Sequence, residues 1–337
     1  MIKTITRVLL ILLVVFAALY YYGTGSNLKS KDYFTIKKYN PVVTIESDTL
    51  SERTFTVMTF NIGYLSGMTN NTSAETSYSF YRKNLDKAIE VIGNLHPNVI
   101  GFQEIDFASS RSYFQQQLDS IAIRNEYAEA YQSVNWDKRY VPFPYIPISS
   151  HFGKIISGQA ILSDFELVDY KTITLDKPEN NPFYYNAFYI DRLIQISTCR
   201  IGDRELKILN VHLEAFDRAS RISQSKRVRK VYEQHASEMP VLMIGDFNSE
   251  LPHESEIVSG GIREILKAEN IASAISAEEY NKDKKSFYTY SSGDPSKMID
   301  FIFYNPSHIR KIDARVVNEM GEVSDHLPKW MSFTFTQ

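Results

Sequence analysis

Cysteine is almost absent from this chain of 337 residues, which contains only Cys199. A single cysteine cannot form an internal disulfide, and no cysteine cluster is present for structural zinc. The sequence also has no HExxH motif or closely spaced Cys and His pair that would indicate a zinc site. Cys199 lies in the alternating segment 194–202, so we predict that it is a small apolar residue buried in a strand.

An excess of positive charge is also missing, because 37 Lys and Arg residues stand against 40 Asp and Glu residues, a net charge of −3. Proteins that grip long nucleic acids usually carry a basic surface, so this balance argues against such a role. Internal repeats and low-complexity segments are absent as well. The hydrophobic fraction of 43% instead indicates an ordinary folded protein.

One long uncharged segment lies near the N-terminus. Residues 8–28 contain no charge, and these 21 residues match the ~20 that are needed to cross a bilayer core. Lys3 and Arg7 precede the segment, and three tyrosines at 20–22 lie near its outer end, as in membrane anchors. We therefore predict a single-pass membrane protein with 1–28 as anchor, its N-terminus in the cytoplasm and the remainder extracytoplasmic. A cleaved signal peptide is the alternative, although the segment matches a cleavage site poorly.

The rest of the chain is expected to form a linker followed by one domain. Residues 29–53 are polar and mixed, which indicates a linker with one edge strand near 42–47. From 54 to 337, β-rich runs are interspersed with two helical patterns, at 79–96 and 218–236. Because strands and helices do not alternate strictly, two packed sheets with outer helices fit better than a doubly wound sheet.

Polar side chains recur where the predicted strands end. A strand end is a rigid support, so residues from several strands can converge there on one site. Carboxylate and amide oxygens suit magnesium, manganese or calcium, and the histidines suit proton transfer. Each residue alone is a weak signal, because such residues are also common in turns. The set consists of Asn61, Glu104, His212, Asp246, Asn248, Asp300, Asp325 and His326.

These residues lie in six of seven blocks that occur in a fixed order. The blocks are TFNIGY (59–64), NVIGFQEID (98–106), GQAILSDFEL (158–167), NVHLEAFD (210–217), IGDFNSE (244–250), MIDFIFY (298–304) and SDHLP (324–328). In this set and order the chain resembles the endonuclease/exonuclease/phosphatase (deoxyribonuclease I-like) superfamily, which includes nucleases, inositol polyphosphate 5-phosphatases and neutral sphingomyelinases. The resemblance implies an α+β fold. It would be a four-layer αββα sandwich of two mainly antiparallel sheets flanked by helices, preceded here by one transmembrane helix.

The resemblance also implies a metal-dependent phosphoesterase. Mg²⁺ is the expected cofactor, with Mn²⁺ as an alternative, and Glu104 helped by Asn61 would hold the ion. His326 would act as general base on the attacking water, and Asp300 would support its protonated form.

Four further residues receive roles from the same resemblance. Asp246 would align the attacking water, while Asn248 and His212 would stabilise the charge that develops on the phosphate. Asp325 would lie near the metal or orient its neighbour.

Some residues have no matching position in the family pattern. Arg192 could reach a phosphate or form a surface salt bridge. The segment 135–154 combines aromatic residues with prolines, so it is either an ordinary packed loop or a stiff aromatic wall that recognises substrate. Its candidate substrate contacts are Trp136, Tyr140 and His151.

The shared motifs leave the substrate open, including the choice between monoester and diester. The predicted tether and the aromatic segment favour a lipid head group of the sphingomyelin or phosphoinositide kind. A nuclease acting on extracytoplasmic DNA or RNA is an alternative on nearly equal terms. The basic residues of 218–230 indicate either a solvated helix face or a patch for nucleic acid or acidic lipid. A third hypothesis, a binding domain without activity, conflicts with the complete set of site residues. No protein partner is implied.

Overall fold

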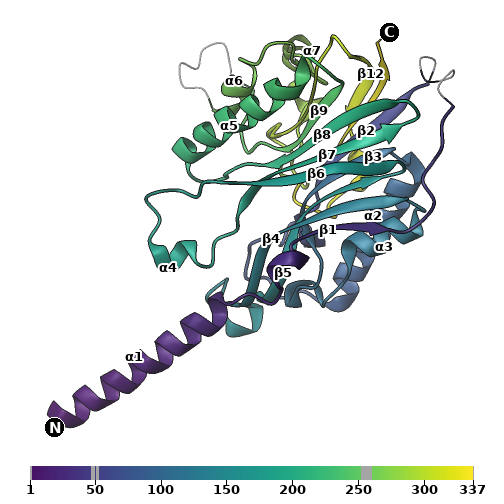
Figure 1. Ribbon diagram of the computed structural model, residues 1–337. Helices are drawn as coiled ribbons and strands as arrows, with labels where there is room; N and C mark the ends of the chain where they lie inside the picture. The colour runs from purple at the N-terminus through teal and green to yellow at the C-terminus, as the bar shows by residue number, and fades with distance from the viewer. Residues whose placement is uncertain (1, 47–49, 51–52, 252–259, 337) are drawn as a thin grey trace.

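The strands form two sheets that pack face to face (Figure 1). The computed structural model describes residues 2–46, 50, 53–251 and 260–336. In spatial order, the seven-stranded sheet contains β1 (Phe34–Lys38), β4 (Glu129–Val141), β5 (Gly153–Ser163), β3 (Val99–Asp106), β2 (Phe55–Asn61), β13 (Lys329–Phe335) and β12 (Ile309–Val316). The six-stranded sheet contains β10 (Ala272–Ser273), β11 (Asp300–Tyr304), β9 (Val241–Asp246), β8 (Arg204–His212), β7 (Arg192–Ile201) and β6 (Glu166–Leu175).

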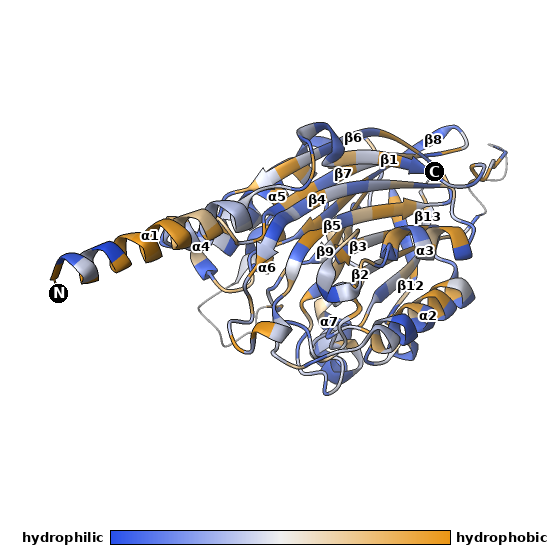
Figure 2. Ribbon diagram, turned by 90° about the horizontal axis from the view of Figure 1, so that it is seen from below, coloured by the Kyte–Doolittle hydropathy of each residue, from blue (hydrophilic) through white to orange (hydrophobic). Residues whose placement is uncertain are grey.

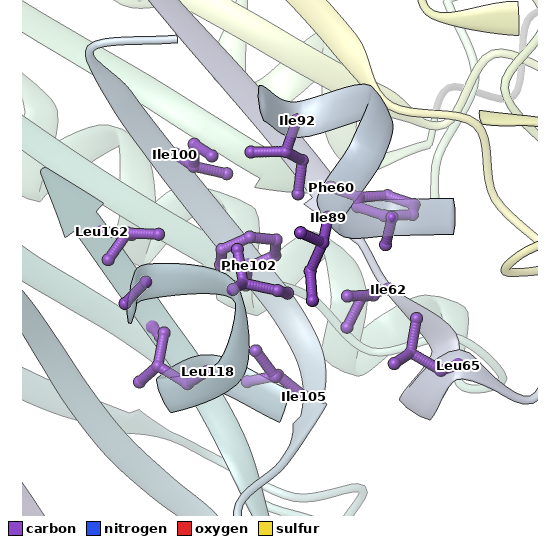
Figure 3. Packing of buried hydrophobic residues seen from close by; sticks show 14 of the residues in the cluster. Phe60, Ile62, Leu65, Ile89, Ile92, Ile100, Phe102, Ile105, Leu118 and Leu162 are labelled. Carbon is purple, nitrogen blue, oxygen red and sulfur yellow. The ribbon is translucent and has the colours of Figure 1, made fainter. Parts of the chain in front are cut away.

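Helices cover the outer face of each sheet. The α-helices of the described residues are α1 (Ile2–Thr24), α2 (Tyr78–Leu95), α3 (Gln117–Arg124), α4 (Phe183–Asn186), α5 (Arg218–Ala236), α6 (Gly261–Ile265) and α7 (Ala277–Lys282). Ile89 and Ile92 of α2 pack on Phe102 of the seven-stranded sheet (Figure 3), and Val228 and Tyr232 of α5 belong to the core of the six-stranded sheet. A third apolar cluster lies between the sheets. This confirms the predicted four-layer sandwich.

Local signals explain the helix bounds and the strand pattern. Ser77 caps α2 by accepting a hydrogen bond from the backbone N–H of Phe80, and the helix ends at His96, which is left-handed and precedes a proline. Both predicted helices are therefore confirmed. Cys199 is confirmed as a buried strand residue, and burial raises the pKa of its thiol to about 12.

A buried network of amides joins the two sheets. Asn210 of β8 accepts a hydrogen bond from Gln103 of β3 at 2.6 Å and donates to the backbone oxygen of Phe102 at 3.0 Å. It also donates to Gln195 of β7 at 3.0 Å. Gly101 provides the space for this contact, because a Cβ there would lie 2.9 Å from Oδ1 of Asn210. These bonds fix how the sheets are aligned, which in turn aligns the strand ends described below.

The N-terminal helix projects away from the sandwich (Figure 1). In the described part of the chain, α1 is the one helix that is long and apolar enough to cross a membrane, and its apolar residues are exposed (Figure 2). Strand β1 follows and pairs with the outer edge of β4. The edge strand thus lies earlier than expected, since 42–46 are irregular and Ser47 lies outside the described residues.

The junction after α1 is bound to the sandwich. The carboxylate of Asp137 in β4 accepts hydrogen bonds from the backbone N–H groups of Asn27 at 2.8 Å and Leu28 at 2.9 Å. The hydroxyl of Tyr33 donates to the same carboxylate at 2.9 Å. Gly23 is buried, and a Cβ there would lie 2.9 Å from the backbone oxygen of Tyr140. The end of α1 is therefore packed against β4 without a free spacer.

Candidate active site

The predicted site residues lie where two parallel strand pairs end side by side. Strands β2 and β3 run parallel in one sheet, and β8 and β9 run parallel in the other. His212 and Asp246 are neighbours at the ends of β8 and β9, and Asp300 at the start of β11 is opposite Asp246. From the end of β2, Asn61 donates to Asp246 across the two sheets at 2.9 Å.

His326 is held by an aspartate and a serine. Its Nδ1 lies 2.9 Å from Oδ2 of Asp300, and its backbone N–H donates to Oγ of Ser324 at 3.1 Å. The serine hydroxyl in turn donates to the backbone oxygen of Asn61 at 2.8 Å. The ring of Tyr290 covers the imidazole at 4.9 Å between ring centres. This leaves Nε2 of the histidine facing the other polar groups of the site.

The groups that face Nε2 of His326 are Asp246 and Asn61. Oδ2 of Asp246 lies 3.8 Å away and the amide nitrogen of Asn61 lies 3.4 Å away. Burial by itself lowers the pKa of His326, but the charges of Asp300 and Asp246 outweigh burial and hold that pKa well above its ordinary value. Burial also raises the pKa of Asp246. The imidazole is therefore a strong base whose protonated form is stabilised by two carboxylates.

Glu104 and Asp325 form a second group of acids. The amide nitrogen of Asn70 donates to Glu104 at 3.1 Å and to Asp325 at 3.2 Å, so the carboxylates share one donor. A β-bulge after Phe102 and a positive φ of 51° turn Glu104 out of the regular strand pattern. Burial, and then the charge of Asp325, raise the pKa of Glu104.

This pair of acids fits a divalent cation. Two carboxylates that are close together repel each other, and a hard cation would remove that repulsion while taking oxygen ligands. Ligand atoms of Asp246, Asp300 and His326 also lie within 4.8 Å of one another. Those three groups, however, already interact as an ion-paired set, with His326 between the two aspartates. Glu104 with Asp325 is consequently the better candidate for a metal site.

Arg192 and His212 form the basic side of the site. Both are buried, and Nη1 of Arg192 donates to Nε2 of His212. Burial, together with the charge of Arg192, lowers the pKa of His212 well below its ordinary value, so that this imidazole is neutral. Arg192 also lies 3.7 Å from the buried carboxylate of Glu214. Its ion pair is thus inside the site and not on the surface.

Asn248 and Asp246 are placed by an unusual backbone. Gly245 has φ 146°, and a Cβ there would lie 1.9 Å from the backbone oxygen of Val211, so only glycine fits before Asp246. Asn248 has φ 48°, its N–H donates to Asp246 at 2.8 Å, and its amide donates to the backbone of Leu213 at 3.0 Å. The amide of Asn248 is therefore fixed beside the acid.

Most of these groups line one large groove. The groove has a volume of about 2200 Å³, and it also includes Trp136, Tyr140 and His151. Tyr140 and His151 interact with each other, with 2.7 Å between the hydroxyl and Nδ1. Trp136 donates from its ring nitrogen to the backbone oxygen of Phe188 at 2.8 Å. The three candidate contacts thus form part of the wall of the groove that the acids also line.

Three site residues were missed by the sequence analysis. Asn70 lies in a polar run that is typical of a loop, and Tyr290 lies outside the seven blocks, so neither carried a signal. Glu214 lies two residues after His212 in the NVHLEAFD block, where its charge within an apolar run could have indicated a role. It accepts a hydrogen bond from Tyr189 at 2.6 Å and faces Arg192.

Comparison with solved structures shows proteins with a similar fold. A truncated TDP2 structure from Caenorhabditis elegans is 18% identical, covering 85% of this chain and 99% of that one, with a TM-score of 0.54. A mannosyl-6-phosphatase from Bacteroides thetaiotaomicron VPI-5482 is 15% identical, covering 83% and 100%, with a TM-score of 0.57. An endonuclease/exonuclease/phosphatase from Beutenbergia cavernae DSM 12333 is 18% identical, covering 84% and 72%, with a TM-score of 0.59.

At these identities the solved structures share the fold with this chain. A comparison with curated proteins gave no match. The sequence model of the Endonuclease/Exonuclease/phosphatase family matches residues 58–326, which include every strand-end residue identified above. The chain therefore belongs to the endonuclease/exonuclease/phosphatase family.

Proposed function

We propose that this protein is a membrane-tethered, divalent-metal-dependent enzyme that hydrolyses a phosphodiester by in-line attack of water. The observation that carries the proposal is the position of His326. Its Nδ1 is bound to Asp300, and its Nε2 faces the site next to Asp246. Phosphoester chemistry is supported by family membership and by the mannosyl-6-phosphatase among the structural neighbours.

In this proposal His326 is the general base. Its Nδ1–H donates to Asp300, which leaves Nε2 free to accept a proton from the attacking water. Asp246 lies on the same side of the ring and orients that water by accepting its second hydrogen. Asn61 holds Asp246 in place through the bond that crosses the two sheets.

Glu104 would hold the metal, for which we propose Mg²⁺, with Mn²⁺ able to replace it. Asp325 is next to Glu104 and would provide a second oxygen, and Asn61 remains a predicted helper through its amide oxygen. When bound, the ion would neutralise charge on a phosphate oxygen. Asn70 would keep the two carboxylates in position.

Three residues would stabilise the charge that develops during attack. Arg192 is a fixed, buried cation that donates to neutral His212, and His212 and Asn248 line the same groove as Arg192. Polar groups whose positions are already fixed need little reorganisation, so they favour the transition state over the bound substrate. Trp136, Tyr140 and His151 would contact the rest of the substrate along the groove.

We also propose that residues 1–28 anchor the protein and that 29–53, which include β1 of the seven-stranded sheet, connect the anchor to the rest of the catalytic domain at 54–337. Lys3 and Arg7 before the span place the N-terminus in the cytoplasm and the domain outside it. An uncleaved anchor is supported by the packing of Gly23 against the backbone oxygen of Tyr140 and of Tyr20 against Phe188, because cleavage near residue 24 would remove both contacts.

The test is hydrolysis of bis(p-nitrophenyl) phosphate by the full chain in detergent with MgCl₂. We expect turnover that EDTA abolishes and that His326→Ala lowers by about 10²-fold or more. His308→Ala is the matched control, since His308 is a partly exposed histidine that does not line the groove. Near-normal turnover in the His326 variant would show that the base is wrongly assigned.

A further inference from the structure

The mouth of the groove is surrounded by exposed apolar side chains. We call them the apolar collar, and each is more than half exposed. They come from the segment between β4 and β5, from α4, and from the chain just before α5. The collar consists of Tyr145, Ile146, Ile148, Phe183, Tyr184 and Phe216. All of these except Ile146 line the groove that also contains Glu104 and His326.

The collar is directly continuous with α1. The ring of Tyr20 near the end of α1 contacts Phe183 and Phe188 edge-on, at 6.5 Å and 5.7 Å between ring centres. Figure 1 shows α4 beside the base of α1. Phe16 and Leu19 of α1 line the same groove as the catalytic residues. The groove is therefore lined both by the apolar helix and by the acids of the site.

The contact between Tyr20 and Phe183 determines how far the collar lies from the membrane. If α1 spans the membrane as proposed, Tyr20 lies at the outer interface, where aromatic side chains are favoured. Residues that contact Tyr20 lie at the same level, and Phe183 is one of them. Exposed apolar groups at that level are stabilised by contact with the membrane and destabilised by water.

We propose that the apolar collar rests on the membrane and that the substrate is the phosphoester head group of a lipid in that membrane. The inference depends on the function and the anchor proposed above. A lipid substrate would account for the size and the apolar lining of the groove. Its volume of about 2200 Å³ is well above the ~300–1,000 Å³ of ordinary small-molecule pockets. The head group would reach His326 while the acyl chains stay at the collar.

The same features argue against nucleic acid as substrate. A polymer of phosphates is bound by many basic side chains, whereas the described residues that line the groove include four, Arg192, Arg221, Lys284 and Lys297, and Arg192 is held by His212 and Glu214. On α5, Arg221 donates to the backbone oxygens of Glu214 and Ala215, and Arg229 pairs with Glu233 at 3.1 Å. These two arginines already have partners within the protein.

The first experiment locates the collar without using activity. Cys199 is buried, so Ile146→Cys gives a single accessible site for an environment-sensitive fluorophore in the full chain. The labelled protein is reconstituted in vesicles of phosphatidylethanolamine, phosphatidylglycerol and sphingomyelin in equal parts. We expect blue-shifted emission that is quenched by brominated lipids. Ile123→Cys, an exposed isoleucine on α3, is the matched control and should remain in water. Equal signals from both sites would overturn the membrane contact.

The second experiment compares two substrates. The variant Ile146→Asn/Ile148→Asn/Phe183→Ser should release head groups from the same vesicles more than about tenfold more slowly, after its vesicle rate is divided by its own rate on soluble bis(p-nitrophenyl) phosphate. Ile123→Asn/Ile312→Asn is the control with exposed apolar residues elsewhere.

The outcomes separate the two proposals. Equal rates of the collar variant and the control on vesicles would overturn the lipid substrate, as would cleavage of nucleic acid but not of vesicles by the unmodified chain. Failure of the unmodified chain to cleave even the soluble diester would instead overturn the proposed function, and the fluorescence result would still decide whether the collar touches the membrane.

Discussion

The ammonium group of Lys329 lies 5.1 Å from the centre of the Phe301 ring, so that a side chain from one sheet reaches a residue of the other. Lys329 is buried, and among the described residues no group accepts a hydrogen bond from its Nζ. Burial lowers the pKa of Lys329 to about 7, although the nearby charge of Asp300 opposes this effect. A buried lysine of this kind makes the free energy of unfolding depend on pH.

We expect Lys329→Met to stabilise the fold most strongly below pH 7. Between the folded pKa of about 7 and the ordinary value of 10.5, the unfolded chain binds one more proton than the folded chain. The free energy of unfolding of the unmodified protein therefore rises across this range, by up to about 1.4 kcal/mol per pH unit. Methionine does not titrate, so the variant should lack this pH dependence. Urea unfolding at several pH values measures the free energy of unfolding of the variant, with Lys171→Met on the exposed face of β6 as control. Parallel curves for both variants would contradict the prediction.

Asp300→Asn should lower kcat by about 10²–10⁴-fold while leaving KM close to normal. The amide cannot replace the carboxylate that accepts from Nδ1 of His326 and stabilises its protonated form. Steady-state kinetics on the soluble diester would measure kcat and KM separately. Asp313→Asn changes an exposed aspartate in β12 and should have no effect. A variant that raises KM alone would place Asp300 in substrate binding.

Glu104→Gln should weaken Mn²⁺ binding at least about tenfold, because an anionic oxygen next to Asp325 is lost. Without metal, the same variant should be more stable than the unmodified protein, since it removes one of two neighbouring, partly buried charges. Titration calorimetry and melting with and without MnCl₂ measure both effects. Glu269→Gln, an exposed substitution, is the control. Unchanged Mn²⁺ binding would remove Glu104 from the metal site.

Asp137→Ala should make residues 24–28 accessible to protease while hydrolysis of the soluble diester continues. The substitution leaves the N–H groups of Asn27 and Leu28 without their acceptor, and each charge-assisted bond contributes about 1.5–3 kcal/mol. Limited proteolysis of the full chain in detergent, followed by mass determination of the fragments, shows the cut. Asp169→Ala on exposed β6 is the control. Resistance equal to that of the control would mean that other contacts hold the junction.

Periodicity predicted the elements that carry the core, because α2, α5 and the long strands bury residues at regular intervals. Strand β1 was missed since it pairs with β4 at the edge of the sheet, mostly through backbone bonds. Asn70 could not be found from sequence either. Its role comes from a contact with Asp325, which lies 255 residues away along the chain. Order along the chain indicated which residues form the site, but not which of them share a donor.

The docked junction between α1 and β4 has a consequence for selectivity. A catalytic domain on a long flexible spacer could reach phosphates at many distances from the bilayer, as well as phosphates dissolved in the surrounding medium. Here the bonds of Asn27 and Leu28 to Asp137 fix the domain close to the end of the helix. If α1 spans the membrane as proposed, the catalytic residues stay at one fixed distance from the membrane surface. The enzyme would then select its target by how far the phosphorus projects from the bilayer, and encounters would depend on lateral diffusion of lipids.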